Sequence, residues 1–495
     1  MGVIARQSLK GTIVTYLGVA VGFVTTFFVL TRFLSAEEIG LARVLIDAAT
    51  LFIGLAQLGT SSSIIRFFPY FAEKPVRQSE GRSDNYHGFF FWTLLIPLVG
   101  FCLFACIYWA CSTPLSAWFG DKSPLFVNYY YFVLPLAFFM LYQTIFETNA
   151  NVLMHIVVPR AVREVVVRVG LLVCYLLYAF ECISMDGFVV SLCATYAMAA
   201  AVNVVYLFSI GQISLRPDIP FLKSNPQLVR RFGLYTAFLI VSALTSVLAP
   251  MLSGFFITAK MGLNYTGIFA IATYIAVMVS IPYRSLVAIT QPELAHAIKD
   301  NNKPDTTRLI AQTSNTLMLV GGFIFLLIWI NIDLIFALLP NGQTFAVAKN
   351  TVLLLCLGQW MVASFNIFNS TLSYSRYYAL SLLNSCVLTV SAIVLNNALI
   401  PVYGMDGAAL ATVLSDVIYY LLVVGISCGA LRIQPFNRRH LLTVILMLAL
   451  FALNYWLLPI HCLIRTVLLV GGGLAVAWFL NLSPEINALL RRIRI

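Results

Sequence analysis

Residues 88–111 read GFFFWTLLIPLVGFCLFACIYWAC, a run of 24 residues without a charged side chain. An α-helix rises about 1.5 Å per residue, so roughly 20 apolar residues are enough to cross the hydrocarbon of a bilayer. The run does not alternate between apolar and polar residues, which favours a helix over a strand of a membrane barrel. This stretch therefore predicts a transmembrane helix.

The composition of the whole chain agrees with this stretch. Of the 495 residues, 61% are hydrophobic and 10% are charged, whereas soluble domains have about 45–50% apolar and about 25% charged residues. A soluble fold has too little interior to bury so much apolar surface. In lipid the backbone must satisfy its own hydrogen bonds, and the long runs select helices. The chain is predicted to be an all-α polytopic membrane protein.

Fourteen apolar runs are candidate spans, and the last two are the shortest. The first run carries Gly18 and Gly22, a small-residue face that predicts close packing against another helix, with a hinge as the alternative. The runs are 11–34, 39–68, 88–111, 127–149, 162–181, 187–210, 233–257, 265–290, 309–333, 349–372, 378–400, 406–428, 441–458 and 463–481.

The basic residues predict the orientation. With the N-terminus in the cytoplasm, 23 of the 30 lysines and arginines fall in cytoplasmic segments, and only Arg32, Lys122, Lys260, Lys349 and Arg465 face outside. This bias is the positive-inside rule. Because the C-terminal segment is also basic, the number of spans must be even, which supports fourteen. The net charge of +11 therefore reports topology, and no nucleic-acid partner is expected.

Two short matches predict an internal repeat. Met-Asp-Gly occurs at 185–187 and again at 405–407, and the turn at 33–40 corresponds to the turn at 260–267. The offsets of 220 and 227 positions suggest two parallel copies of a six-helix unit, although apolar sequences can also match by coincidence. The predicted parts are an N-terminal lobe at 1–225, a C-terminal lobe at 226–432, and two further helices with a basic cytoplasmic tail at 433–495.

Three stretches resemble one known family. They are Ile4-Ala-Arg-Gln-Ser8, Leu34-Ser-Ala-Glu-Glu-Ile-Gly40 and Leu399-Ile-Pro-Val-Tyr-Gly-Met-Asp-Gly-Ala-Ala-Leu-Ala-Thr412. With twelve plus two spans, the chain is similar to bacterial polysaccharide-biosynthesis (O-antigen and exopolysaccharide) flippases of the multidrug/oligosaccharidyl-lipid/polysaccharide exporter superfamily. Lipid II flippases and multidrug extruders are their relatives.

The resemblance implies a function. A V-shaped pair of six-helix lobes around a central cavity would move undecaprenyl-diphosphate-linked oligosaccharide from the cytoplasmic to the periplasmic leaflet of the inner membrane, by alternating access. The product would serve lipopolysaccharide, capsule or exopolysaccharide assembly. Na⁺ or H⁺ would drive the transport, polysaccharide assembly proteins are possible partners, and no cofactor is expected.

Ionisable side chains within a span are costly in lipid, so they are the first candidates for a functional role. Arg43 and Asp47 lie four residues apart in the second run and share one helix face, with Asp47 near the midplane. They are interpreted either as a cavity wall, in which Arg43 meets the diphosphate and Asp47 tunes or couples transport, or as a structural ion pair.

The fifth run begins with Arg160, Glu164 and Arg168, which recur every four residues and form one charged stripe. A stripe of this kind suits a cytoplasmic vestibule with a cation for the arriving diphosphate. The alternative is that the side chains extend to the interface, which suits Arg160 better than Arg168.

Four more ionisable residues complete the set. Asp416, near the midplane of the twelfth run, would be protonated, paired with an arginine or a site for a coupling ion. Glu147, near the inner end of the fourth run, is expected to be solvated at the interface, with coupling or an ion pair as the alternative. Arg66 and Arg284 close the inner ends of the second and eighth runs and would contact headgroups or capture the diphosphate.

No motif predicts an enzyme. There is no GxxxxGK phosphate loop and no HExxH, and the ten cysteines and five histidines show no metal-ligand spacing. A polymerase or ligase would need a larger external segment than residues 112–126. A multidrug extruder would need acidic residues in its cavity, whereas arginines are at least as numerous as carboxylates in these spans. A non-transporting scaffold is the remaining alternative.

Overall fold

The computed structural model describes residues 14–15, 17–72, 86–153, 155–210, 215, 217–224, 226–375, 377–458 and 461–484, and within these ranges the chain is helical and contains no strand. The helical segments are η1 (Thr25–Leu30), α2 (Thr31–Phe33), α3 (Ala36–Ala56), α4 (Thr60–Ala72), η2 (Tyr86–Gly88), α5 (Phe89–Ala110), α6 (Ser112–Gly120), α7 (Pro124–Asn128), η3 (Tyr130–Phe132), α8 (Val133–Val152), α9 (Val157–Ala161), η4 (Val162–Val166), α10 (Val167–Ala179), α11 (Met185–Ser209), α12 (Ile219–Ser224), α13 (Pro226–Lys260), α14 (Leu263–Val277), η5 (Met278–Ser280), α15 (Ile281–Lys299), α16 (Lys303–Ile330), α17 (Ile332–Leu338), α18 (Gly342–Ala346), α19 (Lys349–Tyr374), α20 (Tyr378–Ala430), α21 (Arg438–Trp456), α22 (Cys462–Thr466), η6 (Val467–Gly471) and α23 (Gly472–Phe479).

Each of the fourteen predicted runs falls on a helical segment where the structure describes it. By length and composition, 10 described helices can cross a membrane, and Leu17–Phe33 and Val247–Lys260 are shorter apolar helices. One of the ten, α20, covers two predicted runs. Gly404 lies between these runs and interrupts the helical backbone, with φ 58° and ψ −132°. The prediction of a polytopic all-α membrane protein is confirmed.

The prediction of a single helix over the second run was wrong. It breaks between α3 and α4, where Leu58 has φ 48° and Gly59 has φ 68°. These left-handed conformations end the first helix, and glycine adopts them without a steric cost. Arg66 therefore lies on α4, a separate amphipathic helix, and does not extend the helix that carries Arg43 and Asp47.

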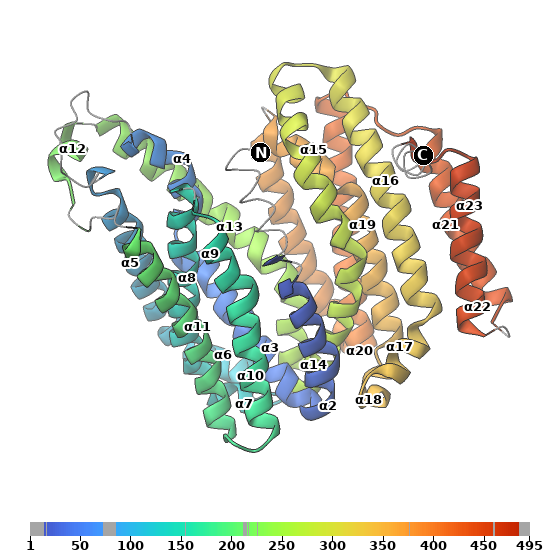
Figure 1. Ribbon diagram of the computed structural model, residues 1–495, viewed down its shortest axis with the longest axis horizontal. Coiled ribbons are helices and arrows are strands. Elements are labelled where there is room, and N and C mark those ends of the chain that lie inside the picture. Colours follow the sequence, from blue (N-terminus) through green and yellow to red (C-terminus); the bar gives the residue numbers. More distant parts are fainter. Residues whose placement is uncertain are drawn as a thin grey trace. The chain divides into compact units, whose positions relative to one another are not determined.

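The chain forms two compact units. Unit 1 comprises Met1–Met251 and Thr258–Gly267, and unit 2 comprises Leu252–Ile257 and Ile268–Ile495. Within unit 2, the long helices α15, α16 and α19 lie side by side (Figure 1). They share an apolar core with α20 that includes the buried side chains of Leu294, Leu317, Phe368 and Tyr420. The three-part division expected from the sequence stays a prediction.

Two glycines in unit 1 form a reciprocal helix crossing. A Cβ on Gly40 would collide with the carbonyl oxygen of Leu263, and a Cβ on Gly267 would collide with the carbonyl oxygen of Ala36. Leu263 and Gly267 stand 227 positions after Ala36 and Gly40, so the contact maps onto itself under the offset found in the sequence. Such reciprocity is expected where two copies of one motif meet across a two-fold axis.

The two Met-Asp-Gly triplets also make equivalent contacts. Asp186, at the start of α11, accepts a hydrogen bond of 2.5 Å from the hydroxyl of Tyr129, which lies near the beginning of the fourth predicted span. Asp406, in the second half of α20, accepts one from the Thr351 hydroxyl in the first turn of α19. Each aspartate of the triplet thus binds the outer end of the span two places earlier. These contacts support the internal repeat.

Candidate functional site

The charged stripe of the fifth span lies on α9, η4 and α10 in unit 1. The segment Val162–Val166 is a π-helix, a form that occurs mainly as short insertions within α-helices and often at functional sites. Arg168 still reaches Glu164 one turn away, with Nη2 2.9 Å from Oε2. Two members of the stripe are therefore paired along the same face.

A second arginine on this segment joins the stripe to a neighbouring helix. Arg163 Nη1 lies 2.8 Å from Oε1 of Glu147 on α8, and its Nε lies 3.3 Å from Oε1 of Glu164. Arg163 thus bridges two carboxylates on two helices. Arg163 is one of the 23 basic residues assigned to the cytoplasmic side from the sequence. Its position beside Glu164, within the fifth run, already marks it as an ionisable residue of a span.

Glu147 was wrongly expected to be solvated at the interface. Its side chain is only 9% exposed, and α8 packs against both α11 and α3. A buried carboxylate needs a charge partner or a proton, and Arg163 supplies the positive charge. The structure thus joins Glu147 to the stripe, which the sequence alone could not do, because the two residues belong to different spans.

The other end of the charge network contacts the first span. Arg168 Nη1 donates a hydrogen bond of 2.6 Å to the carbonyl oxygen of Gly18, and a Cβ on Gly22 would lie 2.7 Å from the same nitrogen. A Cβ on Gly18 would collide with the carbonyl oxygen of Glu164. The small-residue face predicted for the first span is thus confirmed as a close helix contact.

These contacts form one chain across three spans, which we call the charge network: Glu147, Arg163, Glu164, Arg168 and the Gly18 carbonyl. The Arg163 side chain is 50% exposed, whereas Glu147 and Glu164 are 9% and 13% exposed. The guanidinium is therefore the accessible group. Arginine binds phosphate oxygens through two parallel hydrogen bonds, so this arrangement can bind an anionic phosphate ester.

Arg43 and Asp47 form a separate ion pair on α3, with Nε 2.7 Å from Oδ2. Their side chains are 27% and 12% exposed, so the pair is mostly removed from solvent. The expectation that they share one face is met. Both interpretations of the pair stay open as predictions.

The remaining candidate arginines lie on three different helices. Arg66 is exposed on α4, and its guanidinium carbon lies 4.1 Å from the ring centroid of Tyr235 on α13. Arg284 is exposed on α15, and Arg160 is half-buried on α9. Neither Arg160 nor Arg284 forms an ion pair within the described ranges. The role of these three residues stays a prediction.

Asp416 lies in unit 2, in the second half of α20. Its Oδ2 lies 3.6 Å from the point where a Cβ on Gly358 would stand, so the carboxylate faces the bare backbone of α19. In the part of the chain that the structure describes, it has neither a hydrogen bond nor an ion pair, and no group of three His, Cys, Asp or Glu could hold a metal ion. Arg6, Lys10, Arg491, Arg492 and Arg494, on which the cytoplasmic termini were predicted, lie outside the described residues.

Several solved structures are similar to this chain in fold. A lipid II flippase, MurJ, in an inward closed conformation shares 12% identity with a TM-score of 0.65, covering 94% of this chain and 98% of that one. A Vibrio cholerae MATE transporter, VcmN, in the bent form shares 12% identity at a TM-score of 0.53, covering 87% and 98%. A MOP superfamily transporter from Pyrococcus furiosus shares 14% identity at a TM-score of 0.56, covering 87% and 95%.

At these identities the likeness shows the fold alone, and no curated protein matches the chain in sequence. The family described as "Polysaccharide biosynthesis protein" matches residues 6–296, which is more than half of the chain. This match agrees with the resemblance of the opening stretches. The chain is a multi-pass membrane protein that belongs to the polysaccharide biosynthesis protein family.

Proposed function

We propose that this protein is a flippase that moves a polyprenyl-diphosphate-linked oligosaccharide from the cytoplasmic to the outer leaflet of the inner membrane. The observation that carries the proposal is the charge network, in which the half-exposed Arg163 bridges Glu147 and Glu164 within spans. The family match and the fold shared with a lipid II flippase support it.

The physical task is to move a diphosphate and a polar glycan through hydrocarbon while the polyprenyl tail stays in lipid. The carboxylates of the network neutralise its arginines, because an unpaired charge is costly within a span. A diphosphate offers more acceptor oxygens than one carboxylate and competes for the same guanidinium groups. Release of the diphosphate restores the ion pairs, so the network can bind the substrate without holding it permanently.

The orientation in this proposal is inferred from the charge bias. By the positive-inside rule the basic segments, with both termini, lie on the cytoplasmic side. The inner membrane and the direction of transport are inferred from the resemblance to polysaccharide flippases, whose substrate would enter from the cytoplasmic side. Other polysaccharide assembly proteins are expected partners, with lipopolysaccharide, capsule or exopolysaccharide as the product.

Coupling is assigned to Asp416, with Arg43 and Asp47 as a second ion pair that can respond to the substrate. Asp416 is a carboxylate in a span without a charged partner among the described residues, and such groups bind H⁺ or Na⁺ in many transporters. In this proposal the gradient of that ion resets the protein after each transfer.

The test is complementation of a strain that lacks its own flippase, at matched expression. Surface polysaccharide and lipid-linked sugar in the cytoplasmic leaflet are measured together for wild type, Arg163→Ala, Arg168→Ala and Arg43→Ala. Arg308→Ala is the matched control, because Arg308 forms an exposed ion pair with Asp305 at 3.0 Å outside the network.

The proposal expects wild type and Arg308→Ala to restore surface polysaccharide, while Arg163→Ala and Arg168→Ala accumulate lipid-linked sugar inside. If wild type fails in its native background while the lipid-linked sugar still reaches the outer leaflet, the proposal falls. Export of organic cations by such a wild type would favour a multidrug extruder instead.

A further inference from the structure

A row of hydroxyl groups leads into unit 2 from the turn that joins α19 to α20. Ser373, in the last turn of α19, is exposed, and its Oγ lies 3.2 Å from Oγ of Ser381 on α20. Ser381 is half-buried and donates a hydrogen bond of 2.8 Å to Oδ1 of Asn369. The row therefore begins at the surface of the unit, at the end where the two helices are connected.

The row continues one helical turn further along α20. Ser385 follows Ser381 by four residues, so both side chains share one helix face, and the Ser385 hydroxyl donates to the Ser381 carbonyl at 3.0 Å. The Ser385 side chain is also hydrogen-bonded to the hydroxyl of Tyr419, in the second half of α20. Ser385 is half-buried and Tyr419 is only 6% exposed. We call Ser373, Ser381, Ser385 and Tyr419 the hydroxyl row.

The hydroxyl row ends at Asp416. This residue precedes Tyr419 by three positions, and both Tyr419 and Tyr420 interact electrostatically with its carboxylate. Tyr283 of α15 interacts in turn with the two tyrosines, and α19 presents the bare backbone of Gly358 to the carboxylate. No other charged side chain acts on Asp416 among the residues that the structure describes. A carboxylate in such surroundings must hold a proton or bind a cation.

The chemistry of the row favours a proton. A hydroxyl group both donates and accepts hydrogen bonds, so it can accept a proton on one side and release its own on the other. A sodium ion needs several oxygen ligands at once, whereas Asp416 has no second carboxylate beside it in the described chain. The steps from Ser381 to Ser385 and from Tyr419 to Asp416 each cover about one helical turn, roughly 5–6 Å between Cβ atoms, which one bridging water molecule can span.

We propose that the hydroxyl row conducts protons between the surface of unit 2 and Asp416, and that the ion bound at Asp416 is H⁺. A proton enters from water at Ser373, each hydroxyl passes one proton to the next, and the last proton converts the Asp416 carboxylate to the neutral acid. Release runs through the same groups in the reverse order. This inference rests on the proposed function, which assigns coupling to Asp416, and it names the ion and its route.

Infrared spectroscopy tests the row on purified protein in lipid bilayers. The carbonyl band of a protonated carboxyl group shifts when deuterium replaces the proton, and the Asp416 band is identified by its absence in Asp416→Asn. The band is expected at acidic pH and is lost as the pH rises. After transfer to D₂O, Tyr419→Phe and Ser385→Ala are expected to exchange about 100-fold more slowly than wild type, because a positioned proton-transfer group contributes about that factor or more.

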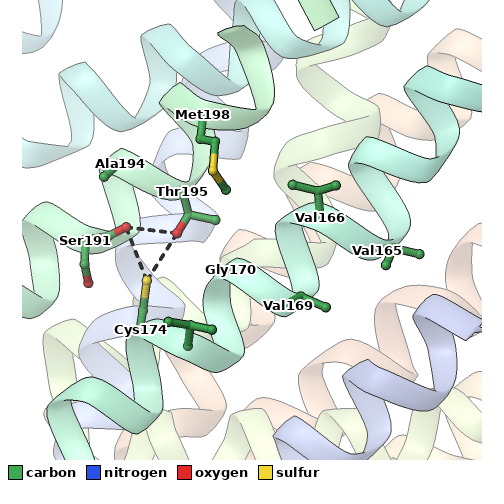
Figure 2. Close-up of a pocket in the computed structure, with 10 residues that line it drawn as sticks. Val165, Val166, Val169, Gly170, Cys174, Ser191, Ala194, Thr195 and Met198 are labelled. Carbon is green, nitrogen blue, oxygen red and sulfur yellow. Dashed lines mark hydrogen bonds between the residues drawn. The ribbon is translucent and has the colours of Figure 1, made fainter. Parts of the chain in front are cut away.

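Two variants serve as matched controls for the loss of a hydroxyl. Tyr420→Phe alters a tyrosine that is also 6% exposed and also interacts with Asp416, but that has no hydrogen bond to the row in the described part of the chain. Thr195→Val removes a hydroxyl from unit 1, where it donates to the Ser191 carbonyl at 3.0 Å in an apolar pocket whose lining holds no carboxylate (Figure 2). Both controls are expected to exchange at the wild-type rate, and melting temperatures show that every variant is folded.

Three results would overturn the proposal. Equal exchange rates in wild type, Tyr419→Phe and Ser385→Ala would exclude the row as the route. A missing Asp416 band at every pH at which the protein is folded would exclude proton binding there. Loss of the band on adding sodium chloride at constant pH, with no such loss on adding choline chloride, would make Na⁺ the ion.

Complementation in cells separates this proposal from the proposed function. If wild type restores surface polysaccharide while exchange does not depend on Tyr419 or Ser385, only the row is wrong. If exchange depends on both residues while wild type moves no lipid-linked sugar, the row stands as a proton route and the proposed function falls. In vesicles, Tyr419→Phe is expected to lose the response of transport to an imposed proton gradient, and Tyr420→Phe is expected to keep it; an unchanged response in Tyr419→Phe contradicts the row.

Discussion

At the scale of single residues, the charge network depends on Arg163. Removing its guanidinium leaves Glu147 buried without its charge partner. Breaking a buried ion pair costs about 3–5 kcal/mol, but Arg163 is half-exposed, so Arg163→Ala is expected to lower the unfolding free energy by about 1–3 kcal/mol. Thermal unfolding of purified protein in detergent measures this.

The double variant Arg163→Ala with Glu147→Gln removes the uncompensated charge and is expected to recover most of that loss. Arg308→Ala is expected to change the unfolding free energy by about 1 kcal/mol or less, because its pair is exposed. An equal loss for Arg163→Ala and Arg308→Ala would mean that the burial of Glu147 does not depend on Arg163.

Asp416 is the second residue that gives a sharp test. Asp416→Asn keeps the shape of the side chain but cannot take up or release a proton. If Asp416 couples transport, this variant is expected to lose the dependence of transport on the ion gradient and to show a lower rate. The measurement is transport in vesicles with imposed proton or sodium gradients; a variant that responds to both as wild type does would exclude Asp416.

At the scale of elements, the close crossing of α3 and α14 depends on two glycines, which have no side chain. Gly40→Ala and Gly267→Ala would each push a Cβ into a backbone carbonyl of the other helix, and neither helix can give way without moving as a whole. Both variants are expected to lower the melting temperature by a similar amount, because the contact is reciprocal.

Gly425→Ala is the control for this pair. A Cβ there meets nothing within 4 Å, and alanine favours an α-helix over glycine by about 1 kcal/mol. This variant is expected to melt at the wild-type temperature or slightly above it. If Gly40→Ala and Gly267→Ala melt as the control does, the helices do not approach as closely as described.

At the scale of the whole molecule, topology is the testable quantity. Alkaline phosphatase is active only outside the cytoplasm. A fusion after residue 437, between α20 and α21, is expected to be inactive, and one after residue 457, between α21 and α22, is expected to be active. Activity in the reverse order would invert the predicted orientation and with it the proposed direction of transport.

The polytopic helical fold could be predicted from the sequence, because the length and apolar character of each span are properties of the chain itself. The close face at Gly18 and Gly22 was readable for the same reason. The break at Gly59 was not, because a glycine inside an apolar run is compatible with a continuous helix. The link between Glu147 and Arg163 could not be predicted either, since their separate spans meet only when the helices pack.

The reciprocal glycine crossing also bears on how such a chain diverges. If the two halves arose from a duplicated gene, most positions in one copy became free to drift from their counterparts. Gly40 and Gly267 did not, because each residue is confined by the main chain that surrounds its counterpart. A change at either site harms a contact that both halves share, so the two codons are expected to remain a matched pair in descendants whose other residues have lost all trace of common ancestry.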